Sequence, residues 1–253
     1  MELHRREAGS GRPIVLLHGL FGSNENLGGL ARALVDRYRT IGLDLRNHGR
    51  SPHADSMDYA DLAADVEETM DALGLDSATL IGHSLGGKTA MELALSRPER
   101  VDRLVVLDIA PVAYERHHDE ELEALLGLDL AALGSRREAD EALAGHIPNA
   151  GVRQFLLKNL RRGDAGFEWR LPLATIEAEY PHIAAAPPSP GPFNGPALFL
   201  HGGASDYVKP AGEAAIHERF PSARVEAIEG THHWLHVEAP EAVAEHIAAF
   251  LAR

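Results

Sequence analysis

Ser84 is the residue of this sequence that is best placed to act as a nucleophile. It is the central residue of the pentapeptide G-H-S-L-G at residues 82–86. The segment before it, residues 78–81, is apolar and typical of a strand, and residues 85–96 have a helical pattern. A serine between glycines on a sharp strand-to-helix turn holds its hydroxyl clear of its neighbours, where a base can reach it. The pattern therefore predicts nucleophilic catalysis by Ser84.

A serine nucleophile needs a histidine that takes its proton. In a parallel sheet the reactive groups gather at the carboxyl ends of the strands, so candidate histidines should lie in loops that follow strands. His232 and His233 both meet this condition, because they follow a strand expected at residues 225–228. Their position late in the chain agrees with the order serine, acid, histidine that this kind of turn requires.

Two aspartates are candidates for the acid that orients the histidine. Asp206 follows a strand expected at residues 197–201, and Asp108 ends a strand expected at residues 103–108. Either carboxylate could hold the imidazole in the useful tautomer, and the other is expected to bond backbone N–H groups in its own loop. We narrowly favour Asp206 and keep Asp108 as the alternative.

Backbone amides are expected to bind the oxyanion that forms during acyl transfer. The N–H of Leu85 directly follows the nucleophile at a helix amino terminus, where the helix dipole favours negative charge. The second donor should come from the loop after the strand at residues 13–17. Leu20 is our first choice for it and Phe21 is the fallback.

The elements that must position these groups alternate between strand and helix. Further strands are expected at residues 40–44 and 224–228, with helical patterns between the strands. This alternation predicts an α/β fold with a mostly parallel sheet that is covered by helices on both faces. Residues 112–194 have helical patterns and no clear strand, so we interpret them as a cap inserted into a core of residues 1–111 and 195–253.

Several motifs together resemble the α/β-hydrolase superfamily, and most closely the YbfF-like bacterial esterases. They lie at residues 18–19, 44–51, 82–88, 108–112, 154–158, 180–183 and 233–234. The resemblance implies the α/β-hydrolase fold, a serine carboxylesterase for short to medium acyl chains, and thioesterase activity toward acyl-CoA as an extension. It favours His233 over His232, because the family's histidine directly precedes the aromatic residue matched by Trp234. The resemblance does not decide whether Asp206 or Asp108 orients this histidine.

We expect the substrate pocket to involve the cap. The apolar residues Phe155, Leu156 and Leu160 are our candidates for the lining of the acyl pocket. Arg153, Lys158, Arg161 and Arg162 form a basic stretch that could contact acyl-CoA phosphates, but a solvated helix face is the favoured interpretation.

Composition narrows the classes of function. The formal net charge of −14 disfavours nucleic-acid binding, and the absence of cysteine excludes disulfides and thiolate chemistry. We expect a soluble cytoplasmic protein, monomeric or a small homo-oligomer, that acts on a small acyl ester or thioester without cofactor, metal or membrane span. His117 and His118 precede three acidic residues, but a solvated helix face explains them better than a metal site.

Related chemistries remain as alternatives. Serine at the elbow argues against dehalogenase and epoxide hydrolase activity, both of which need aspartate there. Cofactor-free perhydrolysis and C–C bond hydrolysis use the same three residue types and stay open. A non-enzymatic receptor on this fold is the rival from another class.

Overall fold

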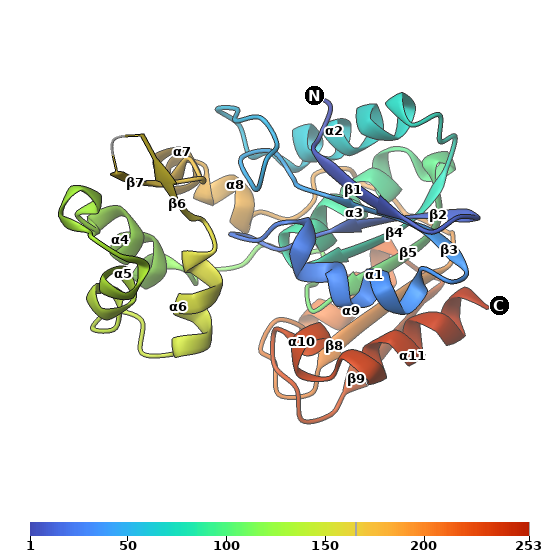
Figure 1. The fold of residues 1–253 in the computed structure, drawn as a ribbon. Coiled ribbons are helices and arrows are strands. Elements are labelled where there is room, and N and C mark those ends of the chain that lie inside the picture. Colours follow the sequence, from blue (N-terminus) through green and yellow to red (C-terminus); the bar gives the residue numbers. More distant parts are fainter. Residues whose placement is uncertain (165, 253) are drawn as a thin grey trace.

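The computed structural model describes residues 1–164 and 166–252 (Figure 1). Its centre is a seven-stranded sheet with the strand order β1-β3-β2-β4-β5-β8-β9. Only β1 runs antiparallel to its neighbour, and the other pairings are parallel. The strands are β1 (Arg5–Ala8), β2 (Arg12–Leu17), β3 (Tyr38–Leu43), β4 (Ala78–His83), β5 (Val101–Leu107), β8 (Ala197–Gly202) and β9 (Ala223–Ile228). The α/β-hydrolase architecture that was expected is thus confirmed.

Helices cover both faces of the sheet. Successive strand residues point to opposite sides, so apolar residues on each face need helices to bury them. On β2, Ile14 and Leu16 belong to one apolar cluster, and Val15 and Leu17 belong to the other. α1 (Gly28–Leu34) and α11 (Pro240–Leu251) pack in the first cluster. α2 (Tyr59–Ala72), α3 (Leu85–Ser96) and α9 (Pro210–Arg219) pack in the second. Short elements complete this part: η1 (Asn24–Leu27), η2 (Pro98–Arg100) and α10 (Leu235–Glu238).

The chain between β5 and β8 forms a lobe beside the carboxyl ends of the strands (Figure 1). Its elements are α4 (Asp119–Gly127), η3 (Leu130–Ala132), α5 (Arg136–Leu143), α6 (Ala150–Leu157), β6 (Leu160–Gly163), β7 (Gly166–Trp169), α7 (Leu173–Ala178) and α8 (Tyr180–Ala184). We call this lobe the cap. Its apolar residues join the core cluster on the α3 side of the sheet, so cap and core pack together.

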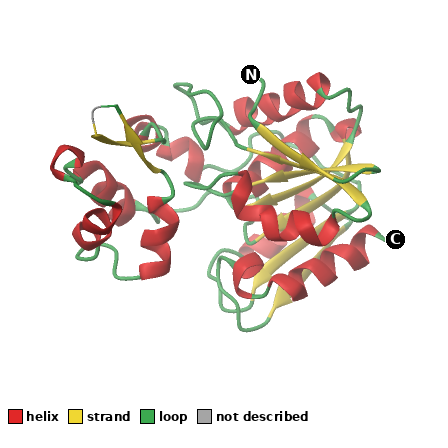
Figure 2. Ribbon diagram, viewed as in Figure 1, coloured by secondary structure: helices red, strands yellow, loops and turns green. Residues whose placement is uncertain are grey.

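The cap contains a strand pair that the sequence did not predict. β6 and β7 form a small antiparallel sheet, seen in yellow within the cap in Figure 2. Leu160 pairs with Trp169 and Arg162 pairs with Phe167. The strands have four residues each, and two successive arginines interrupt any apolar alternation in β6. The expectation of a cap without strands was therefore wrong.

The described residues contain neither a membrane-spanning helix nor a cluster of metal ligands. Within residues 1–164 and 166–252, no helix combines the length and apolarity needed to cross a membrane. In the same ranges, His, Asp and Glu side chains nowhere form a group of three or more that could hold a metal ion.

Candidate active site

Ser84 occupies a strained turn between β4 and α3. Its φ and ψ angles are 51° and −114°, in a region that a residue with a side chain rarely adopts. The glycines on either side are needed for space. A Cβ atom on Gly82 would collide with the carbonyl oxygen of Gly86, and one on Gly86 would collide with that of Leu17. The sequence thus builds a sharp elbow that presents the Ser84 hydroxyl at the sheet edge.

His233 meets Asp108 and not Asp206. The Nδ1 atom of His233 lies 2.7 Å from Oδ2 of Asp108, whose side chain is fully buried. The side chain of Asp206 is 92% exposed, and its carboxylate pairs with Lys209 at 3.3 Å. The narrow preference for Asp206 is therefore corrected in favour of Asp108. His232 also points elsewhere, since its ring contacts Glu238.

The Asp108 carboxylate is held by three donors. Besides the His233 ring, it accepts hydrogen bonds from the backbone N–H of Gly202 at 2.9 Å and from the Ser205 hydroxyl at 2.5 Å. Asp108 itself has a φ of 52°, which turns its side chain off the end of β5. The Tyr207 ring stacks on a face of the His233 ring, with ring centroids 4.0 Å apart. These contacts leave the imidazole little freedom to rotate.

The backbone donors separate into free and occupied groups. Within the described residues, the N–H groups of Leu85 and Leu20 have no hydrogen-bond acceptor. The N–H of Phe21 does have one, because it donates to Nε2 of His48 at 3.1 Å. Phe21, the fallback donor, is therefore unsuited to bind an oxyanion in this conformation. Leu20 and Leu85 are the pair that the geometry leaves available.

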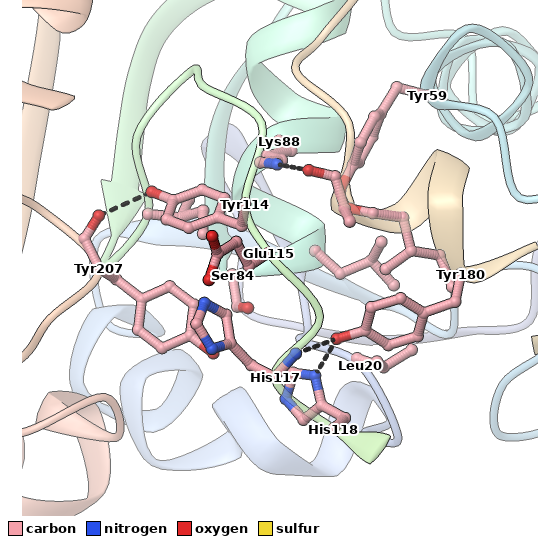
Figure 3. Close-up of a pocket in the computed structure, with 14 residues that line it drawn as sticks. Leu20, Tyr59, Ser84, Lys88, Tyr114, Glu115, His117, His118, Tyr180 and Tyr207 are labelled. Atoms are coloured by element: carbon pink, nitrogen blue, oxygen red, sulfur yellow. Dashed lines mark hydrogen bonds between the residues drawn. The ribbon is translucent and has the colours of Figure 1, made fainter. Parts of the chain in front are cut away.

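Ser84 lines two cavities. The first, which we call the large cavity, has a volume of about 370 Å³ and lies between α6 and the loop of His233. The second, which we call the small cavity, has a volume of about 40 Å³ and lies between α3 and the end of the cap (Figure 3). Among the described residues, Ser84 and His233 both line the large cavity but make no direct hydrogen bond. Such catalytic contacts are often loose without substrate.

The structure brings two of the three residues expected at the acyl pocket to a cavity wall. Phe155 and Leu156 line the large cavity, but Leu160 does not; it is fully buried inside the cap at the start of β6. His118 lines both cavities and shares a 2.6 Å hydrogen bond with Tyr180. Burial lowers the pKa of His118 to about 4, so this ring is neutral. The interpretation of His118 as part of a solvated helix face was therefore wrong.

The basic stretch of the cap is largely engaged in contacts of its own. Arg153 pairs with Asp140 at 2.9 Å, and Arg161 pairs with Glu168 at 2.9 Å. Arg162 lies over the ring of Phe167. Lys158 is the one member that lines the large cavity. This arrangement fits the favoured interpretation of a structural, solvated face better than a cluster that awaits phosphates.

Four residues of the site were missed from the sequence. Ser205 and Tyr207 hold the His233–Asp108 pair, and His48 and Asn159 hold the Phe21 peptide. Burial lowers the pKa of His48 to about 3, so its ring is neutral. Its Nδ1–H donates to the carbonyl of Arg46 at 2.8 Å, which leaves Nε2 free of a proton and able to accept. The only signal was proximity to predicted motifs, since Ser205 and Tyr207 flank Asp206 and His48 lies in the turn at residues 44–51.

Comparisons with known proteins show the family of this chain. The family model described as the alpha/beta hydrolase fold matches residues 12–240. "Esterase YbfF" of Escherichia coli strain K12 is 43% identical over 94% of this chain and 92% of that protein. "sn-1-specific diacylglycerol lipase ABHD11" of Mus musculus is 40% identical over 94% of this chain and 80% of that protein. The solved structure titled "Marine microorganism esterase" superimposes with a TM-score of 0.96 at 38% identity, and covers 98% of this chain and 99% of that one. The chain therefore belongs to the α/β-hydrolase family, as a member similar to the YbfF-like esterases.

Proposed function

We propose that this protein is a serine carboxylesterase that works through Ser84, His233 and Asp108. That it is a carboxylic ester hydrolase follows from its family and from relatives named esterase and lipase. The observation that carries the residue assignment is the 2.7 Å contact between His233 and buried Asp108, at the cavity that also exposes Ser84.

The reaction has two halves with a shared acyl-enzyme. Ser84 Oγ attacks the acyl carbonyl carbon while Nε2 of His233 takes its proton, and Asp108 stabilises the imidazolium through Nδ1. The N–H groups of Leu85 and Leu20 stabilise the tetrahedral oxyanion. His233 then protonates the departing alcohol. In the second half His233 activates water, which attacks the acyl-enzyme and releases the carboxylic acid.

The substrates we propose are oxyesters of short to medium acyl chains. Thioesters could react by the same steps, because a thiolate can also leave from the tetrahedral intermediate that precedes the acyl-enzyme. The ion pairs of Arg153 and Arg161 give no support for preferring acyl-CoA, since both charges are already neutralised.

The test is the Ser84→Ala variant assayed on p-nitrophenyl esters of increasing acyl length, with acyl-CoA species alongside. We expect kcat to fall by about 10⁴-fold or more, because removing a triad member abolishes the nucleophilic route. A fluorophosphonate probe should label the wild-type protein at Ser84 and leave the variant unlabelled. Undiminished hydrolysis by pure Ser84→Ala would overturn the mechanism. Failure of the wild-type protein to label would favour a non-enzymatic receptor.

A further inference from the structure

The two cavities at Ser84 share few wall residues. Of the residues that line each cavity, three are common to both: Leu20, Ser84 and His118. Beyond these three residues the cavities have separate walls: the large one lies along α6 and the loop of His233, and the small one along α3 and the end of the cap. An ester whose carbonyl carbon lies at Ser84 Oγ must place its acyl chain on one side and its alcohol on the other.

The position of His233 decides which side takes the alcohol. A general acid must lie within hydrogen-bond reach of the oxygen that it protonates, and that oxygen belongs to the leaving alcohol. His233 lines the large cavity and is absent from the lining of the small one. Leu85, which offers an oxyanion N–H, lines the small cavity and not the large one. The alcohol should therefore lie in the large cavity and the acyl chain in the small cavity.

The two cavities differ greatly in capacity. One water-sized group needs about 10–15 Å³ of the space that its centre can reach, so the small cavity of about 40 Å³ holds roughly three such groups. The large cavity, at about 370 Å³, holds many more. Its walls include Val152, Phe155, Leu156 and Trp234, with the Phe155 and Trp234 rings 5.6 Å apart. A bulky apolar group fits there.

The inner end of the small cavity is closed by buried, anchored side chains. The hydroxyl of Tyr59 donates to the carbonyl of Ile183 at 2.6 Å. Nζ of Lys88 donates to the carbonyls of Ala184 at 3.1 Å and Ala185 at 2.5 Å, beside the Tyr114 ring (Figure 3). These bonds join α2 and α3 to the last residues of the cap, so the wall cannot withdraw without breaking them.

We propose that the preferred substrates are esters of a short acyl group, of about two to four carbons, with a larger apolar alcohol. This inference rests on the proposed serine esterase function and specifies its substrate class. It reassigns Phe155 and Leu156, which the sequence suggested for the acyl chain, to the alcohol. The small volume of this cavity and its anchored inner wall limit the length of the acyl chain.

A pair of constitutional isomers tests the proposal without any variant. Hexyl acetate and ethyl hexanoate have the same atoms and similar hydrophobicity, but the long chain lies on the alcohol in one and on the acyl group in the other. We expect kcat/KM for hexyl acetate to exceed that for ethyl hexanoate by at least about tenfold, since misplacing even one methylene costs about that much. An equal or reversed ratio would overturn the proposal.

Two alanine variants, one in the wall of each cavity, then distinguish the roles of the two cavities. Ile183→Ala enlarges the small cavity and should lower the hexyl acetate to ethyl hexanoate ratio by about tenfold. Val152→Ala enlarges the large cavity and should leave ethyl hexanoate as disfavoured as before. A ratio that Ile183→Ala does not change, or that Val152→Ala lowers equally, would contradict the assignment.

The outcomes also separate this proposal from the proposed function. If both isomers are hydrolysed and Ser84 labels with fluorophosphonate, but the isomer ratio is equal or reversed, the substrate assignment fails and the esterase mechanism stands. If neither isomer is hydrolysed and Ser84 does not label, the proposed function fails, and the substrate assignment fails with it.

Discussion

Asp108 and Asp206 are chemically identical candidates in opposite surroundings. Asp108 is fully buried and accepts from His233, Gly202 and Ser205. Asp206 is exposed and pairs with a surface lysine. An ion pair of that kind contributes little to stability, whereas a buried carboxylate depends on each donor that it keeps. The two aspartates therefore form a matched pair for mutation.

Asp108→Asn should lower kcat by about 10³–10⁴-fold, because an amide at this position no longer favours the His233 tautomer that accepts from serine. Asp206→Asn should leave kcat within about twofold of the wild type, since no catalytic group contacts it. The measurement is kcat for one activated ester, with thermal melting to verify folding. The opposite pattern, a large loss in Asp206→Asn alone, would restore the sequence-based preference.

At this scale, candidate residues that carry a local signal can be found from the sequence. Ser84 is marked by its own flanking glycines, and His233 by its neighbour Trp234. The choice of aspartate is not local, because β5 and β8 are neighbours in the sheet and both end at the same edge. It depends on the backbone of Asp108, whose φ of 52° turns the carboxylate toward His233. No residue pattern in the sequence encodes that angle.

The helix α3 has a second task besides presenting Ser84. Lys88 and Glu92, one and two turns further along, are almost fully buried and contact the chain that leaves the cap. Lys88 donates to the carbonyls of Ala184 and Ala185, and Glu92 accepts from the backbone and hydroxyl of Ser189. One helix therefore fixes both Ser84 and the end of the cap.

The buried Lys88 should make stability depend on pH. Burial lowers its pKa from 10.5 to about 7, so between these values the unfolded chain binds more protons than the folded one. Stability linked to this group is therefore complete above about pH 10.5 and is lost as the pH falls to about 7. The bonds to Ala184 and Ala185 and the nearby rings of Tyr59 and Tyr114 moderate the loss by stabilising the ammonium.

Lys88→Met removes the titrating group and keeps most of its apolar stem. We expect the urea midpoint of the variant, relative to the wild type, to be highest at pH 7 and to decline toward pH 10. Loss of the bonds to the two carbonyls should shift the urea midpoint of the variant by a similar amount at every pH, and so should not change its dependence on pH. Parallel curves for the two proteins would show that Lys88 does not titrate in this range.

Elements with strong apolar patterns were predicted well, and weakly patterned ones were not. The strand expected at residues 13–17 corresponds to β2, and the helix expected at residues 85–96 is α3. β1 is a polar edge strand, and β6 contains two arginines, so neither shows the alternation that marks a half-buried strand. β6 forms because β7 pairs with it. Such pairing depends on the tertiary structure and not on the local sequence of either strand.

At the scale of the whole molecule, cap and core meet at the Phe21 peptide, in the loop that provides the Leu20 N–H. From the core, His48 accepts a hydrogen bond from the N–H of Phe21 at 3.1 Å. From the cap, the Asn159 side chain donates to the carbonyl of Phe21 at 2.7 Å. Phe21 has a φ of 61°, a conformation that needs such support in a residue with a side chain. The cap thus supports the loop of Leu20, the proposed oxyanion donor, and also lines the large cavity.

Asn159→Ala should therefore slow catalysis from a position outside the substrate cavities. Loss of one hydrogen bond worth about 1 kcal/mol at this loop predicts a fall in kcat of about fivefold to tenfold, with little change in KM. Asn149→Ala is the matched control, because Asn149 is also a cap asparagine but bonds only the first turn of α6. It should lower the stability by about 1 kcal/mol and leave kcat near the wild-type value. If both variants lose kcat in proportion to their lost stability, Asn159 acts only through cap folding and the coupling to the oxyanion loop is wrong.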